Sequence, residues 1–260
     1  MTSKTLKTAL SVLALASVAT GFAQSSAQTT QPPEPSTKLD SSLVFARGSY
    51  GLATDTDVFI ALVSPTFESA DWRLQATVPY VHLKGPASVV GNTGTSTVSH
   101  SASGLGDATL AVTRKLGVGD NGWTTSIGAK VKFPTADKNK GLGTGEFDES
   151  IQADVIKPGG SITPFATLGY QFLGRSTAYP MENGFFATAG FASKVSSENT
   201  VGFAANWRAR TISQGKQAFE AMVFAQHNLT ASSHFQVFFM RGFTDASPDN
   251  TLGLTLGLTF

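Results

Sequence analysis

The stretch that most constrains the fold is Thr251–Phe260, in which apolar residues alternate strictly with small or polar ones. Leucines and Phe260 make up one face, and threonines and glycines make up the other. A strict period of two predicts a β-strand with one apolar face and one polar face. Two environments fit such a strand: the closing strand of a soluble sheet, or a barrel wall with lipid on its apolar side.

The beginning of the sequence resembles a secretory signal peptide. Lys4 and Lys7 precede an apolar run over residues 9–19, and small residues follow it. A positive segment, a short apolar segment and a small-residue site together predict an exported protein. Cleavage fits after Ala23 or after Ala27, and we take residues 1–23 as the signal peptide. The apolar run is too short for a transmembrane helix, and no later stretch approaches the length of one.

Composition excludes several classes of function. The 260 residues contain no cysteine, which rules out disulfides, thiolate metal sites and a cysteine nucleophile. Lysine and arginine together number 19 against 18 acidic residues, so no nucleic-acid partner is expected. Residues 24–40, rich in Gln, Ser, Thr and Pro, predict a flexible periplasmic leader, which leaves residues 41–260 for the folded part.

From residue 41 onward the chain divides into segments of about ten residues with alternating hydrophobicity. None shows the 3.6-residue apolar period of a capped helix, and tilted strands of this length match the hydrocarbon thickness of a bilayer. The predicted strands are 41–51, 56–67, 70–83, 105–116, 122–133, 148–157, 161–173, 184–195, 199–210, 218–229, 233–243 and 250–260.

The connections between these segments favour a membrane barrel over a sandwich. Short turns follow the even-numbered strands, and longer loops such as 84–104, 134–147 and 174–183 follow most odd-numbered ones; only 52–55 breaks the rhythm. Bacterial outer-membrane barrels alternate short periplasmic turns with longer extracellular loops in this way. We therefore predict an all-β fold: a single antiparallel transmembrane barrel of about 12 strands, with both ends of the barrel segment in the periplasm.

Alternation assigns the two faces of most predicted strands. One face of each would meet lipid and the other would line a polar interior, although strands one and two alternate too weakly to assign. The pore-lining candidates are Arg73, Lys130, Lys132, Asp154, Asn206, Arg208, Arg210 and Glu220. The candidates for two interfacial aromatic girdles are Trp72, Tyr80, Trp123, Phe133, Tyr170, Phe243 and Phe260.

A set of short motifs between Gly104 and Gly174 is the most individual part of the chain. It comprises Gly104-Leu105-Gly106-Asp107, Lys132-Phe133-Pro134-Thr135 and Gly143-Thr144-Gly145-Glu146-Phe147-Asp148. These motifs resemble the outer-membrane family named for the meta pathway of phenol degradation. The resemblance implies an outer-membrane channel for small hydrophobic or aromatic molecules, without catalytic residues. The strand Thr251–Phe260 likewise resembles the terminal strand that the barrel-assembly machinery recognises.

The remaining chemistry-bearing residues give no enzyme or metal signature. His82, His100, His227 and His234 are not spaced with acidic residues as metal ligands, and His100 is placed in the loop 84–104 among serines. Outer-membrane phospholipases carry a His-x-Ser element on a strand, and no His here has one. Acidic loop residues show no calcium-loop spacing. We expect no cofactor, no metal and no catalytic residue.

The functional prediction is therefore passive passage of a small solute. The solute would enter among loops 84–104 and 134–147 and pass residues such as Lys130, Arg208 and Glu220. A closed structural or adhesion barrel and a lipid-modifying enzyme are the alternatives. The expected partners are outer-membrane lipid, the barrel-assembly machinery acting on Thr251–Phe260, and a small solute whose identity the sequence leaves open.

Overall fold

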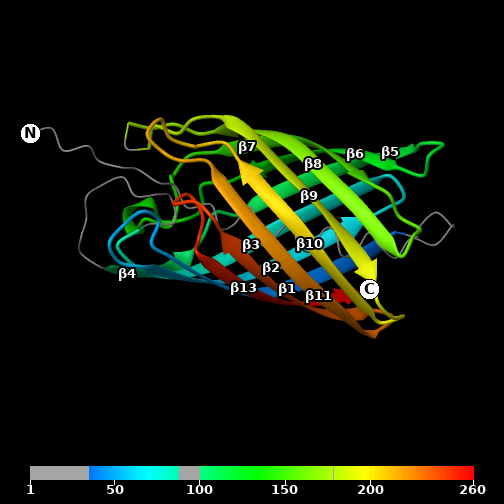
Figure 1. Ribbon diagram of the computed structural model, residues 1–260. Coiled ribbons are helices and arrows are strands. Elements are labelled where there is room, and N and C mark those ends of the chain that lie inside the picture. Colours follow the sequence, from blue (N-terminus) through cyan, green and yellow to red (C-terminus); the bar gives the residue numbers. More distant parts are fainter. Residues whose placement is uncertain (1–34, 88–99, 178) are drawn as a thin grey trace, which may run out of the picture.

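The computed structural model describes residues 35–87, 100–177 and 179–260, and these form one antiparallel sheet that closes on itself (Figure 1). The strands of this part are β1 (Ser36–Gly48), β2 (Thr56–Glu68), β3 (Trp72–Gly85), β4 (His100–Leu105), β5 (Thr109–Val118), β6 (Thr124–Lys132), β7 (Asp148–Ile156), β8 (Ile162–Leu173), β9 (Gly184–Lys194), β10 (Asn199–Arg208), β11 (Ala218–Thr230), β12 (Ser233–Gly242) and β13 (Asn250–Thr259). In the described ranges, no helix is long and apolar enough to cross a membrane.

Closure of the barrel depends on the pairing of β13 with β1. The two strands pair from Lys38 opposite Thr259 to Arg47 opposite Asn250, and β1 pairs with β2 along its other edge. Inside the barrel, the hydroxyls of Ser42 and Thr255 lie 2.8 Å apart across this seam. Because a backbone group has no water partner in hydrocarbon, a closed sheet is the β-structure that can span a bilayer.

Twelve wall positions hold the thirteen strands, because β4 and β5 share one. The half of β3 near the long loops, residues 80–85, pairs with β4. The half near the short turns, residues 72–77, pairs with β5. Between them, Gly106, Asp107 and Ala108 oppose only two residues of β3, Val78 and Pro79, which is a β-bulge. Pro79 has no N–H to donate, while its carbonyl accepts from Gly106 N at 2.9 Å. The predicted twelve-stranded barrel is confirmed, and the predicted unbroken strand 105–116 is wrong.

The two ends of the barrel differ as predicted. Turns such as 69–71 and 231–232 lie at the end where β13 finishes, and the longer loops 133–147, 174–183 and 209–217 lie at the other end (Figure 1). The first strand begins at Ser36 and not at residue 41, because Lys38 and Asp40 point inward, where polar side chains are admitted. The predicted signal peptide and residues 24–34 of the predicted leader lie outside the described residues.

The outer surface of the strands is apolar. Leu43, Phe59, Val223 and Leu254 are between 39% and 53% exposed, as side chains that face lipid would be. Two of the predicted girdle residues lie at the short-turn end: Trp72 begins β3, and Trp123 directly precedes β6. Phe260 follows β13 at the same end. The half near the long loops contains the other four, Tyr80, Phe133, Tyr170 and Phe243. Arg114 points outward near the short-turn end, where its guanidinium lies 5.2 Å from the centre of the Trp72 ring.

Inward-facing glycines form a repeated packing motif with aromatic rings. In five cases a glycine lies directly opposite a ring on the neighbouring strand: Gly169 with Phe186, Gly190 with Phe165, Gly202 with Phe224, Gly253 with Phe238, and Gly257 with His234. A Cβ added at any of the five would collide with that ring. The rings therefore occupy the space that a side chain on the neighbouring strand would otherwise fill, a cross-strand arrangement known to rescue glycines in sheets.

The pairing of Gly253 with Phe238 predicts the effect of a single methyl group. Gly253→Ala should destabilise the barrel by about 1–3 kcal/mol, because the added Cβ displaces the Phe238 ring. The measurement is the urea midpoint of the heat-modifiable gel shift of the refolded protein. In the Gly253→Ala background, Phe238→Leu should restore most of the lost stability. A further decrease of the urea midpoint would show that the collision with the Phe238 ring is not the cause.

Candidate functional site

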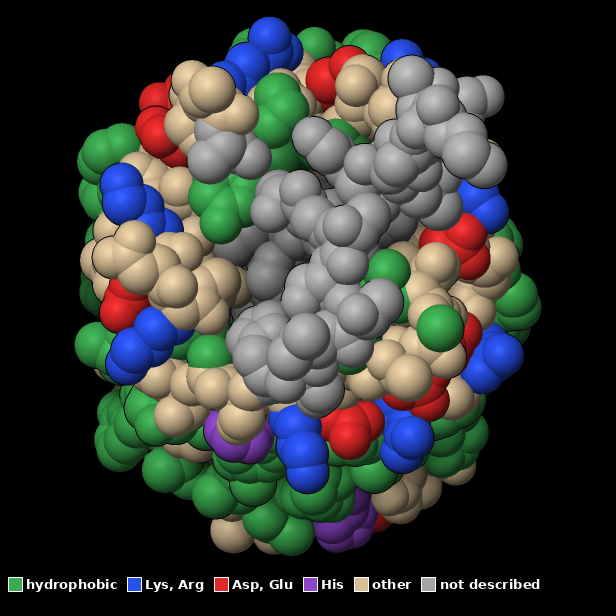
Figure 2. Space-filling view, turned by 90° about the vertical axis from the view of Figure 1, so that its left-hand side faces the viewer, with side chains coloured by type: hydrophobic (Ala, Val, Ile, Leu, Met, Phe, Trp, Pro, Cys, Tyr) green, Lys and Arg blue, Asp and Glu red, His purple; other side chains and the backbone are tan. Residues whose placement is uncertain are grey.

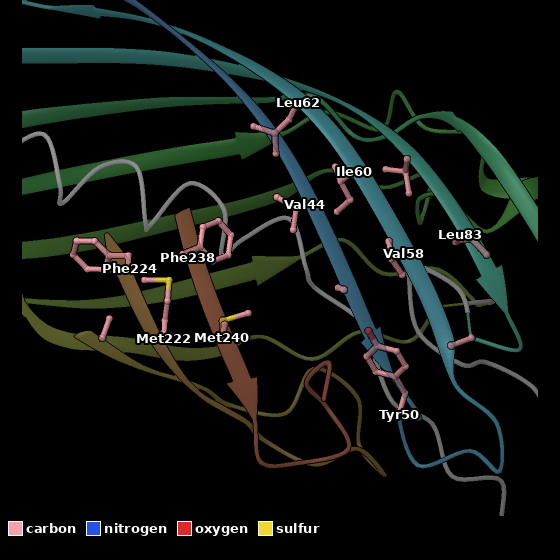
Figure 3. Packing of buried hydrophobic residues seen from close by; sticks show 14 of the residues in the cluster. Val44, Tyr50, Val58, Ile60, Leu62, Leu83, Met222, Phe224, Phe238 and Met240 are labelled. Atoms are coloured by element: carbon pink, nitrogen blue, oxygen red, sulfur yellow. The ribbon is translucent and has the colours of Figure 1, made fainter. Parts of the chain in front are cut away.

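One sector of the barrel interior is apolar. The sector is made by inward side chains of β1, β2, β3, β11 and β12, all at most 6% exposed: Val44, Val58, Ile60, Leu62, Val81, Leu83, Met222, Phe224, Phe238 and Met240. Figure 3 shows most of these side chains on the inner side of the strands, with the methionines and phenylalanines facing the β1–β3 group. The prediction of a polar interior is wrong for this sector. Over residues 43–46 of β1 and 58–63 of β2 both faces are apolar, so alternation carries no contrast there.

Tyr50 adds a polar atom to the edge of the apolar sector. It follows β1 with a positive φ of 51°, and only 2% of it is exposed. Its hydroxyl has no hydrogen-bond partner among the described residues. Burial raises the pKa of the Tyr50 phenol, so it stays neutral and remains available as a hydrogen-bond donor.

A polar sector lies on the inner faces of β6, β7 and β8. Asp154 accepts hydrogen bonds from Gln152 at 2.8 Å and from Thr167 at 2.7 Å, so a ladder of polar groups crosses the strands. On β9 and β10, Thr188 donates to the Asn206 amide oxygen at 2.9 Å. Polar side chains opposite apolar ones make the interior amphipathic in cross-section.

Most pore-lining candidates lie on the inner wall, but they do not form one ring. Lys130 belongs to the polar sector, whereas Arg208 and Glu220 lie on β10 and β11 beside the apolar one, 9% and 2% exposed. Glu220 is opposite Asn206 and not opposite Arg208, and Arg208 Nε has no hydrogen-bond partner among the described residues. Arg73 lies near the short-turn end, where Glu68 is its register partner on β2.

Two placements differ from the sequence predictions. Arg210 lies beyond the end of β10, its side chain 57% exposed at the rim, and pairs with Glu182 at 3.2 Å. The loop conformation after Arg208 ends the alternation on which an inward position was predicted. His100 begins strand β4 instead of lying in a loop, because β3 and β4 pair up to Gly85 opposite His100.

Lys132 connects the sequence motifs into one cluster at the outer mouth. Its ammonium donates to Asp107 at 2.9 Å and forms an ion pair with Asp148 at 2.8 Å. Only 5% of the Asp107 side chain is exposed, and its second oxygen accepts from Ala136 N at 3.0 Å. We refer to Asp107, Lys132, Thr144 and Asp148 as the clasp, because together they tie loop 133–147 to the bulge between β4 and β5.

Neighbouring motif residues complete the clasp. The hydroxyl of Thr144 lies 3.2 Å from the Lys132 ammonium. Thr135 bridges the bulge, since it accepts from Ala108 N at 2.9 Å and donates to the Gly106 carbonyl at 2.8 Å. A Cβ on Gly143 would lie 2.9 Å from both Asp107 carboxylate oxygens, which explains glycine at that position. The three sequence motifs thus describe one structural unit, and Lys132, predicted as pore-lining, has partners that hold a loop.

The family relationship follows from the sequence. Residues 21–260 match the family described as "Putative MetA-pathway of phenol degradation". The chain belongs to this family. No curated protein matches the sequence significantly.

Solved structures confirm the fold. An outer membrane channel from Pseudomonas putida F1 has a TM-score of 0.69 and 13% identity, over 90% of this chain and 100% of the other. The NanC porin has a TM-score of 0.56 and 12% identity, over 85% and 98% of the two chains. The translocator domain of the autotransporter NalP from Neisseria meningitidis has a TM-score of 0.51 and 9% identity, over 94% of each. A closed barrel of this fold with a lipid-facing apolar surface is an outer-membrane protein.

The clasp predicts that a single neutral substitution loosens loop 133–147. Lys132→Met leaves the buried Asp107 carboxylate without its cation, which should destabilise the clasp by about 3 kcal/mol. We expect faster protease cleavage within loop 133–147 of the protein in proteoliposomes, while the barrel itself stays heat-modifiable.

Lys140→Met is the matched control for this experiment. Lys140 is an exposed lysine of the same loop, and no ion pair joins it to another described residue. Its loss should leave the cleavage rate unchanged. Equal cleavage rates for wild type and Lys132→Met would show that the clasp does not hold the loop.

Proposed function

We propose that this protein is a passive outer-membrane channel for small molecules that carry both an apolar, aromatic part and a polar group. The observation that carries the proposal is the amphipathic interior. An aromatic ring can pack against Met222, Met240 and Phe238, while a polar substituent can reach the polar sector around Gln152 and Asp154. Methionine side chains adapt to rings of different shape, which suits a channel that does not select a single solute.

Family and fold support the same proposal. The family description refers to phenol degradation, and the similar structures include an outer membrane channel and a porin. The pore-lining charges would then tune which ions and polar groups pass. Lys130, Arg208 and Glu220 come from different sectors, so we propose local contacts with the solute instead of a charged ring. The three fold neighbours named above are a channel, a porin and a translocator domain, which supports transport over catalysis.

Single-channel recording tests the proposal. The purified protein in planar bilayers should give steady ion-conducting steps, and a bilayer-impermeant aromatic carboxylate should reduce the current in a concentration-dependent way. A sugar of similar size should block far less, because it gains little from apolar contacts. Absence of conducting steps would favour a closed structural barrel, and phospholipid hydrolysis without conductance would favour an enzyme.

Paired variants test the apolar sector itself. Met222→Gln with Met240→Gln should weaken block by the aromatic carboxylate about 30-fold, since each substitution replaces an apolar contact of roughly 1 kcal/mol. Met222→Leu with Met240→Leu is the matched control, and because it keeps the apolar contacts it should leave the block nearly unchanged. Unchanged block in the double variant would place the solute path elsewhere.

We also propose that Thr251–Phe260 is the segment read by the barrel-assembly machinery. The outward leucines of β13 and the exposed Phe260 support it. Phe260→Ser should lower the amount of folded barrel in the outer membrane of intact cells several-fold. Refolding of the same variant in detergent should match wild type, because β13 keeps all its pairings; a refolding defect would indicate lost stability instead.

A further inference from the structure

Two cations on the inner wall near the outer mouth have no carboxylate of their own. Lys130 of β6 and Arg208 of β10 form no ion pair with any described residue. Only 9% of Arg208 is exposed, and its Nε has no hydrogen-bond partner in the described part of the chain. An unpaired charge that is removed from water is costly, so an anion bound beside it would be stabilised.

Other cations near the long loops do have partners. Figure 2, which views the long-loop end, shows cationic and anionic side chains interspersed around the rim. Three ion pairs of this region are Arg47 with Asp55, Arg210 with Glu182, and Lys216 with Asp245. The two interior cations therefore differ from the rim in lacking a counter-ion.

The tilt of the strands keeps these two cations near the mouth. The last pairs of the three hairpins with long loops are Lys132–Asp148, Gln171–Gly184 and Arg208–Ala218. Each of these pairs lies two residues lower in the register than the pair before it, as tilted strands with a level rim require. Arg208 is therefore at the rim on β10, and Lys130 is one inward position below the rim on β6.

The two side chains approach each other across the lumen. Although β6 and β10 are four wall positions apart, the guanidinium of Arg208 and the ammonium of Lys130 repel one another. In a twelve-stranded barrel, backbone positions four strands apart are separated by roughly 20 Å, and two long side chains reduce that gap to roughly 8–10 Å. The two oxygens of a carboxylate can accept from both cations across such a gap.

The wall between the two cations adds neutral donors. Ser150 of β7 is 7% exposed and lies opposite both Lys130 and Gln171. The side-chain amide nitrogen of Gln171 is buried, and no described residue accepts a hydrogen bond from it. Phe186, the register partner of Arg208, leans its ring toward β8 and thus away from the guanidinium. The inner surface from β6 to β10 therefore offers more donors than acceptors at the mouth.

Two carboxylates lie within electrostatic reach of these cations without pairing with them. Asp148 is held in the clasp by Lys132 at 2.8 Å, and its other oxygen accepts a backbone N–H at 2.9 Å. Glu220 lies on β11, outside ion-pair distance of Arg208. Asp154 is deeper on β7, where two neighbouring side chains donate to it. An anionic head group is thus favoured at the mouth and disfavoured below it.

We propose that Lys130, Gln171 and Arg208 bind the carboxylate of an aromatic acid as it enters the channel. This inference rests on the proposed function and identifies the polar group of the solute as an anion. The carboxylate accepts from both cations, and the ring extends toward the apolar sector, beside which Arg208 lies. Charge-assisted hydrogen bonds of this kind are about twice as strong as neutral ones. A neutral or cationic head group leaves both cations unpaired.

An equilibrium binding measurement tests this site without conduction. The probes are benzoate, benzamide, benzylammonium and acetate, titrated at pH 7 against the purified protein in detergent by ligand-observed NMR. Benzoate should bind at least about tenfold tighter than benzamide, which has a similar shape but no charge. Raised ionic strength should narrow that difference. Benzylammonium should bind least among the aromatic probes, and acetate should bind more weakly than benzoate because it lacks the ring.

Variants assign the preference to the two cations. Lys130→Gln with Arg208→Gln should remove the preference for benzoate over benzamide, in protein whose heat-modifiable gel shift verifies folding. Arg73→Gln is the matched control, because Arg73 is an inward arginine at the short-turn end, opposite Glu68. It should bind benzoate as wild type does. An unchanged preference in the double variant, or an equal loss in Arg73→Gln, would overturn the proposal.

The outcomes for wild type separate this proposal from the proposed function. Conducting steps without a preference for benzoate over benzamide would retain the channel and overturn the site. Selective binding of benzoate without conducting steps would retain the site and overturn the channel. Acetate bound as tightly as benzoate would overturn the assignment of an aromatic ligand.

Discussion

The rest of the structure depends on one constraint, which is that hydrocarbon provides no partners for backbone N–H and C=O groups. The pairing of β1 with β13 satisfies this constraint, and the consequences spread over the whole chain. Each strand must keep one face for lipid, so every second residue is apolar over most of the wall. The inner face is released from that requirement. It can therefore hold ion pairs, hydrogen-bonded ladders or apolar side chains, and this barrel holds all three in separate sectors.

The bulge between β4 and β5 is the place where the wall is least regular, and the clasp lies beside it. A β-bulge re-aims one side chain, and here Asp107 is turned toward Lys132. Thr144 of loop 133–147 and Asp148, the first residue of β7, both contact the same ammonium. An irregularity that would otherwise weaken the wall thus becomes the attachment point of a loop at the outer mouth.

The sequence was most informative where the environment accepts only one kind of side chain. Lipid accepts only apolar residues, so the outward leucines of Thr251–Phe260 and the alternation of turns and loops predicted the closed barrel correctly. The barrel interior accepts many kinds of side chain. Val44 and Ile60 alternate with other apolar residues, so the sequence could not assign them to a face. The bulge escaped prediction because it depends on Pro79, a residue of another strand. Alternation predicted Lys132 as pore-lining, but it could not predict the partners of Lys132, which come from sequence positions 25 residues before and 16 residues after it.

The paired glycines and rings have a consequence for the bore of the barrel. A ring laid across a glycine on the next strand lies along the wall, and the same ring beside any larger residue would have to turn toward the axis. The glycines of these pairs, such as Gly202 and Gly253, therefore set the open width of the lumen beside their own strands. This needs no change in strand number or tilt. Relatives of identical architecture could thus differ in the width of their passage through exchanges at glycines that contact no solute.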